Sequence, residues 1–258
     1  MKTSSLIDVL RTQGTLLADA AGRAGLTAPV PTCPGWAVRD LLLHQGGVHR
    51  WAATVVRDRH TGPTGVEQPY DIVEELPDDD VLLDWYRAGH ADLVRIREAA
   101  PADLACWAFL PAPTPLAFWA RRQAHETTIH RVDAEAAAGG GPVAVAGLPP
   151  TAAEDGIDEL LTCFVSGRNR RLRGKPPHTM LVHATDVGAR WLVRVGADLP
   201  RVERVTGDVA ADVSVAGPAV PLYLALWNRL PWDDLVTTGD TPARLADRWA
   251  SDVHVRWG

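Results

Sequence analysis

Apolar residues recur at helical spacing in four stretches of the first 138 residues. The first begins at Ser4–Ser5, which can cap a helix, and runs to about Arg23; the second begins near Ala37, after a proline-containing segment. A third follows the acidic run Asp78–Asp80, and a fourth spans Leu116–Ala138 and stops at a glycine run. The pattern predicts four helices joined by proline-containing loops.

The character of the sequence changes after the segment GGGPVAVAGLPP, in which few contacts are expected. We therefore predict two domains, residues 1–140 and residues 150–258. The stretches HTMLVHATD, ARWLVRVG and ADVSVAG alternate apolar with other residues, which predicts strands of an antiparallel sheet. Helices are predicted at Thr151 to about Arg170, at Leu222–Leu230 and at Ala243–Ala250, so the second half is a small α+β domain.

A histidine interrupts the apolar stripe of the second helix. His44 follows Leu41 by three residues and precedes Val48 by four, so it faces inward where a leucine or alanine would be usual. A buried imidazole requires a polar partner. We expect such a partner to come from another helix.

The fourth helix carries the motif HETTIH. Glu126 and His130 are four residues apart, so a helix can direct both side chains to one point. His125 and His130 are five apart and leave that face, which excludes the HExxH arrangement of zinc proteases. Two histidines and one carboxylate form a pattern of catalytic zinc or non-haem iron, although a Glu-x-x-x-His pair alone is usually a surface hydrogen bond.

The same face of the fourth helix is polar over its whole length: Trp119, Gln123, Glu126, His130 and Asp133 share it. Such a face is not an ordinary core stripe, so it either meets solvent or surrounds a cavity that holds a metal. In the second case Asp133, three residues after His130, is placed to orient the imidazole.

Composition restricts the function classes. The chain has 258 residues, 46% of them hydrophobic, and a net charge of −6, which gives no global attraction to nucleic acid or to an anionic membrane. No apolar leader or membrane-spanning stretch is present in the sequence, so we expect a cytoplasmic protein. Cys33, Cys106 and Cys163 form no CxxC and are expected to be reduced thiols without a catalytic role. The oligomeric state stays open.

Three segments resemble the mycothiol-dependent maleylpyruvate isomerase family: PTCPGWAVRDLLLHQGGVHRWA, HETTIHRVDAE and LALWNRLPWDDLVTTGD. The resemblance implies a DinB-like four-helix metal-binding bundle followed by a sterol-carrier-like α+β domain. It also implies that His44, Glu126 and His130 hold a divalent metal, usually zinc, and that Arg229 in LWNRL acts in catalysis.

The implied chemistry is activation of mycothiol, a low-molecular-weight thiol, for isomerisation or S-transfer on a small electrophilic substrate that bears carboxylates. One alternative is a hydrolase, lyase or cyclase that uses metal-bound water and no thiol. Another is a carrier of an apolar ligand with a structural metal, although a structural zinc ion normally has four protein ligands and only His49 or His125 offers a fourth.

Overall fold

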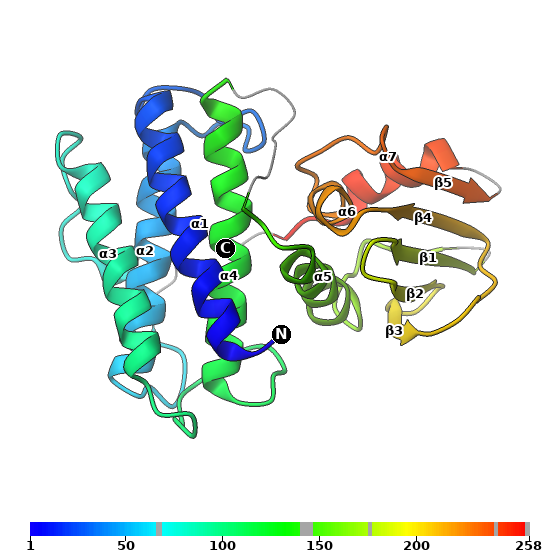
Figure 1. Cartoon of the computed structure of the whole chain (residues 1–258), viewed down its shortest axis with the longest axis horizontal. Helices are drawn as coiled ribbons and strands as arrows, with labels where there is room; N and C mark the ends of the chain where they lie inside the picture. The colour runs from blue at the N-terminus through cyan, green and yellow to red at the C-terminus, as the bar shows by residue number, and fades with distance from the viewer. Residues whose placement is uncertain (66–68, 140–146, 175–176, 240–241, 256–258) are drawn as a thin grey trace. The chain divides into compact units, whose positions relative to one another are not determined.

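The structure is a computed structural model that describes residues 1–65, 69–139, 147–174, 177–239 and 242–255. It forms two compact units, Met1–Gly147 and Leu148–Arg256, which are described separately below (Figure 1). Most of the segment in which we expected the domain boundary, residues 140–146, lies outside the described residues.

The first unit is a bundle of four long helices. These are α1 (Thr3–Ala24), α2 (Val38–Arg57), α3 (Leu82–Ala99) and α4 (Pro115–Ala137), and a short 3-10 turn, Pro69–Ile72, lies between α2 and α3. Both α1 and α2 pack against α3 and α4. Figure 1 shows the four helices gathered in one bundle. The four predicted helices are therefore confirmed.

Capping hydrogen bonds mark where two of these helices, α2 and α4, begin. The Thr114 hydroxyl accepts a hydrogen bond of 3.1 Å from the Ala117 amide, and Pro115 occupies the first turn of α4, where its missing amide hydrogen costs nothing. At the start of α2 the Asp40 carboxylate accepts from the Ala37 amide at 2.8 Å. The first helix begins after Lys2, whose side chain makes no capping bond, so the expected serine cap is wrong.

The helix α4 is buried almost all the way round. Seventeen of its 23 residues are buried, including those of its polar face. That face is therefore not a solvent surface, and its polar groups must satisfy one another or a bound ligand.

The described residues of the second unit form a five-stranded sheet and three helices. The strands are β1 (His178–Ala184), β2 (Ala189–Val195), β3 (Arg201–Val205), β4 (Val213–Gly217) and β5 (Val236–Gly239), in the order β3-β2-β1-β4-β5. The helices are α5 (Pro150–Glu159), which continues as a π-helical segment at Leu160–Val165, α6 (Ala219–Leu226) and α7 (Pro242–Asp252).

The sheet is mainly antiparallel, as the alternating pattern predicts, but one pair of strands, β1 and β4, is parallel. The pairs β1–β2, β2–β3 and β4–β5 are antiparallel, whereas β1 and β4 run parallel. Side chains of one face are buried along the three central strands, for example Met180, Val182, Trp191 and Val215. The Trp191 indole donates to Asp158 of α5 at 2.9 Å, which fixes this helix to the sheet.

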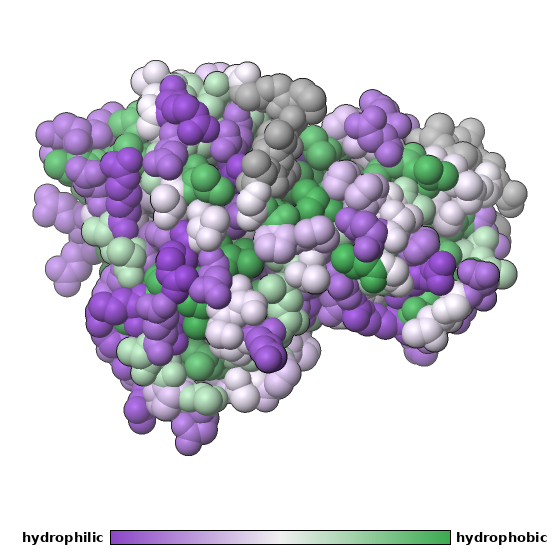
Figure 2. Space-filling model, in the orientation of Figure 1, coloured by the Kyte–Doolittle hydropathy of each residue, from purple (hydrophilic) through white to green (hydrophobic). Residues whose placement is uncertain are grey.

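On the face drawn in Figure 2, hydrophilic residues are interspersed with smaller hydrophobic areas. The large apolar residues that are exposed in the described segments are Met1, Leu76, Val81, Leu199 and Val236. None of the described helices combines the length and apolar character needed to cross a membrane.

Candidate metal centre

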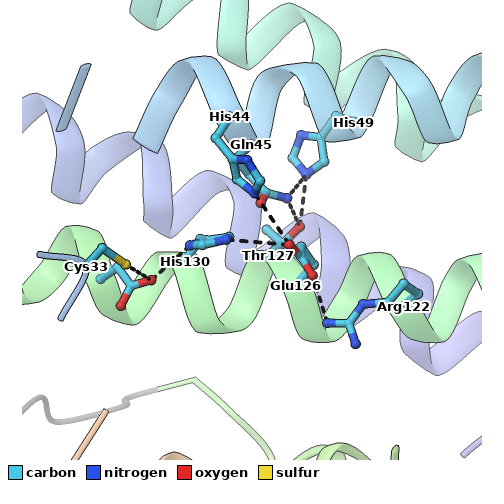
Figure 3. Close-up of polar contacts among 9 residues, drawn as sticks. Cys33, His44, Gln45, His49, Arg122, Glu126, Thr127 and His130 are labelled. Atoms are coloured by element: carbon cyan, nitrogen blue, oxygen red, sulfur yellow. Dashed lines mark hydrogen bonds and ion pairs between the residues drawn. The ribbon is translucent and has the colours of Figure 1, made fainter. Parts of the chain in front are cut away.

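His44 from α2 and Glu126 and His130 from α4 converge inside the bundle (Figure 3). The Glu126 Oε1 atom lies 3.6 Å from His44 Nε2 and 3.5 Å from His130 Nε2. The exposed fractions of these side chains are 12% for His44, 6% for Glu126 and 11% for His130. Sequence reasoning selected these three residues, and the fold brings them together.

The donor set fits a divalent metal. All three donor atoms lie within 4.8 Å of one another. Donors at 2.0–2.1 Å from a tetrahedral zinc ion are about 3.3 Å apart, so the two oxygen–nitrogen distances need to shorten only slightly. Two imidazoles and one carboxylate leave at least one position for an exogenous ligand, which is the arrangement of a catalytic rather than a structural zinc site.

Arg122 supports the carboxylate of this group. One turn before Glu126 on α4, its Nη2 lies 3.0 Å from Glu126 Oε2, and the Arg122 side chain is only 2% exposed. Burial by itself would raise the pKa of Glu126, but Arg122 and the two histidine rings hold that pKa well below its usual range. Glu126 is therefore a carboxylate at neutral pH, as a metal ligand must be.

His130 is held from its other side. Its Nδ1 donates to Asp133 Oδ2 at 2.9 Å, which leaves Nε2 directed at the ligand group. Asp133 is fully buried and also accepts from the Thr32 hydroxyl at 2.5 Å and from the Cys33 thiol at 3.4 Å. Burial opposes charge on the ring, but the hydrogen bonds with Asp133 and Glu126 raise the pKa of His130 to about 9.

Cys33, His130 and Asp133 also lie close enough together to form a second possible ligand group. Its contacts are those of a hydrogen-bond network, because Asp133 accepts from the His130 ring at 2.9 Å and also from the Thr32 hydroxyl and the Cys33 thiol. Asp133 is thus the orienting carboxylate expected from its position in the sequence.

An indole ring covers the histidines. Trp36 stacks on the His130 ring at a centroid distance of 6.1 Å and an angle of 16°, and its centroid lies 5.1 Å from that of His44. Burial lowers the pKa of His44, so this ring is neutral at pH 7 and its nitrogen is available for a metal. The PTCPGW segment therefore has two roles. Its Trp36 ring covers the two histidine rings, and its Thr32 and Cys33 side chains donate to Asp133, which orients His130.

Comparisons with known proteins cover nearly the whole chain. Residues 8–135 match the family model of the mycothiol maleylpyruvate isomerase N-terminal domain, and residues 151–255 match the model of the MDMPI C-terminal domain. The chain belongs to the mycothiol maleylpyruvate isomerase family. The resemblance seen in the sequence motifs is thereby confirmed.

Solved structures agree on the fold. Over 94% of this chain and 95% of the other, the mycothiol-dependent maleylpyruvate isomerase superposes with a TM-score of 0.63 at 13% identity. A histidine-to-alanine mutant of that isomerase gives a TM-score of 0.64 at the same identity and coverage. A search of curated proteins finds no match.

In this family member, His49 does not join the ligand group. It is fully buried and its Nε2 lies 2.9 Å from both the Gln45 amide nitrogen and the Thr127 hydroxyl. Burial lowers the pKa of His49 well below its usual value, so the ring is neutral. His125 also stands outside the two ligand groups found among the described residues.

Arg229 lies in the second unit, just after α6. The preceding Asn228 has a φ of 59°, and the Arg229 amide donates to Leu224 O at 2.8 Å, so the backbone turns sharply at this point. Nη1 of the Arg229 side chain donates to the Trp227 carbonyl oxygen at 2.9 Å. These bonds fix the backbone at Arg229 and hold its guanidinium at the Trp227 carbonyl, while the assignment of Arg229 to catalysis stays a prediction.

Sequence reasoning missed three supporting residues. Arg122 precedes Glu126 by four residues, so charge pairing along the helix could have identified it. Thr32 and Cys33 are about a hundred residues from Asp133, and no local pattern connects them. We expected Cys33 to be a reduced thiol without a catalytic role. Its thiol donates to Asp133, the carboxylate that orients His130.

Proposed function

We propose that the chain is a divalent-metal-dependent enzyme that uses mycothiol for isomerisation or S-transfer on a small electrophilic substrate bearing carboxylates. The observation that carries this proposal is the group of His44, Glu126 and His130, in which two imidazoles and one carboxylate face a common point. Zinc is the metal we favour, because this mixed nitrogen and oxygen donor set with an open position is typical of catalytic zinc.

The family supports the thiol part of the proposal. Members are named for mycothiol and for maleylpyruvate isomerisation, and both halves of this chain match the family's models. The chain is accordingly an enzyme of an isomerase family. The choice between isomerisation and S-transfer depends on the electrophile, which the fold does not determine.

The side chains of the bundle have separable roles in this chemistry. A bound divalent cation makes a thiol deprotonate at neutral pH and so supplies a thiolate nucleophile. Glu126 and the neutral His44 ring supply charge and a nitrogen donor, and Asp133 keeps the proton of His130 on Nδ1. Burial of all three donors limits competing water.

The reaction itself balances without an oxidant. In an isomerisation, the thiolate adds to an activated carbon–carbon double bond, the resulting single bond rotates, and the thiolate leaves to restore the double bond. In an S-transfer the new carbon–sulfur bond is kept, and either the carbanion formed by addition takes up a proton or a leaving group departs from the substrate carbon with its electron pair. We propose that arginines of the second unit, Arg229 first, bind the carboxylates of the substrate.

Elemental analysis combined with calorimetric titration of mycothiol tests this function. We expect about one zinc ion per chain, from a single three-ligand group, and mycothiol binding that requires the metal. The His44→Ala variant should lose both, whereas replacement of the exposed His254 by alanine should retain both.

A rival function, catalysis by metal-bound water, uses the same three residues and is separated by this experiment. Metal binding without any mycothiol binding would favour it, as would turnover in the absence of thiol. A preparation that folds but takes up no divalent metal would exclude both functions.

A further inference from the structure

The two oxygens of the Glu126 carboxylate face different partners. Oε1 points at the nitrogens of His44 and His130, at 3.6 and 3.5 Å, whereas Oε2 lies 3.0 Å from Nη2 of Arg122 (Figure 3). One carboxylate thus belongs to both the ligand group and a buried ion pair.

The different partners of the two Glu126 oxygens affect how many coordination positions of a bound metal stay open. A carboxylate ligates through one oxygen or through both, and the second oxygen would occupy a position that a thiol needs. With three protein ligands of one donor atom each, a tetrahedral ion has a single open position. An unrestrained Glu126 could close it.

Arg122 is well placed to prevent this. Its side chain is 2% exposed and that of Glu126 is 6% exposed, so little water is available to replace the ion pair. Arg122, Glu126 and His130 follow one another at four-residue intervals, and the backbone of α4 therefore keeps all three on one side of the helix. The guanidinium approaches the carboxylate from the side away from His130.

We propose that Arg122 is a positioning residue that holds Glu126 Oε2 away from the metal, so that Glu126 ligates through Oε1 alone and one position stays open for a thiol. The inference deepens the proposed function and rests on the metal-binding part of it. It assigns to Arg122 a role in coordination number, beyond neutralising a buried charge.

The test uses the full chain loaded with Co²⁺, whose visible absorption is strong in four-coordinate sites and weak in five- or six-coordinate ones. Arg122→Met removes the guanidinium at similar length. The matched control is Arg131→Met, because Arg131 is also buried on α4 and pairs with Glu135, four residues on, at 3.3 Å. Glu135 is not part of the ligand group.

We expect R122M to bind one Co²⁺ per chain and to lose visible absorption, because both oxygens of Glu126 then reach the metal. Titration with 2-mercaptoethanol should produce a sulfur-to-cobalt band in the wild-type protein and in R131M. In R122M the same band should require about tenfold more thiol or more, within the range typical of residues that support metal ligands. A structural role alone would lower the melting temperature of both variants without changing the spectrum.

A wild-type spectrum and thiol response in R122M would overturn the inference. If R122M does not fold, R122K decides in its place: a lysine keeps the charge but reaches less far, so absorption should be intermediate, and an unchanged spectrum would count against the proposal. Failure of the wild-type protein to bind any divalent metal would instead refute the proposed function. Binding of Co²⁺ and 2-mercaptoethanol without binding of mycothiol would refute only its mycothiol part.

Discussion

His130 and Asp133 are joined by a hydrogen bond of 2.9 Å from the ring Nδ1 to the carboxylate Oδ2. The three-residue spacing on α4 places the carboxylate beside the ring, and burial excludes water that could compete for it. The bond keeps a proton on Nδ1 when the ring gives up its other proton to bind a metal, so the orientation of Nε2 follows from a residue outside the group of His44, Glu126 and His130.

Asp133→Asn should weaken metal binding by about 10- to 100-fold, because an amide is a poorer acceptor and its NH₂ group can face Nδ1 instead. Competition with a chromophoric chelator measures the affinity. Thr32→Val is the graded comparison: it removes one donor to Asp133 but leaves the bond to His130, so its effect should be smaller. Equal affinity in Asp133→Asn and the wild type would show that the ring needs no such partner.

Metal binding should release about one proton per ion at pH 7, the proton coming from the His130 ring. In the metal-free protein the pKa of His130 is about 9, that of His44 is lowered and that of Glu126 is well below its usual range, so only His130 must lose a proton to become a ligand. Affinity should therefore rise with pH by about tenfold per unit up to about pH 9 and then level off.

Calorimetry in buffers of different ionisation enthalpy at fixed pH counts these protons. Release of two protons would mean that His44 is also charged before binding. Release of none at pH 7 would show that the metal-free His130 ring is already neutral.

Thr127→Val should reduce the free energy of unfolding by about 1–3 kcal/mol, because the buried His49 ring and the Gln45 amide both lose a partner. Thr128→Val on the same helix is the control, since the Thr128 hydroxyl bonds only the Ala124 carbonyl of its own turn among the contacts described. Urea unfolding of the two metal-free variants compares them, and similar losses would argue against a role for Thr127 as a shared partner.

Arg229→Ala should leave metal content unchanged and impair turnover, if the side chain binds a substrate carboxylate as we propose. A rise in KM with little change in kcat would indicate binding of the ground state. Global unfolding of the variant, seen by circular dichroism, would instead assign Arg229 to the fold around Trp227.

The sequence predicted the bundle because apolar periodicity and helix capping are local properties. It also selected His44, Glu126 and His130, since an inward histidine and a four-residue spacing can be recognised without a structure, and their role as ligands stays a prediction. The hydrogen bonds from Thr32 and Cys33 to Asp133 join distant segments, and no local rule predicts them. In the second unit, β3 and β5 were missed because they are short and mostly exposed, so they lack the alternating pattern.

The direction of the β1–β4 pair was unpredictable for a related reason. The alternating pattern of a strand shows which of its faces is buried. It does not show which strand lies beside it, or whether the two strands run parallel or antiparallel.

The support of Asp133 by the loop before α2 limits how this centre could be transplanted into another protein. Grafting the three donor residues onto an unrelated pair of helices would reproduce their spacing but neither the fixed ring nor the restrained carboxylate. A functional graft would have to carry Arg122, Asp133 and the loop that meets them, so the smallest portable unit is a set of contacts spread over a hundred residues of chain.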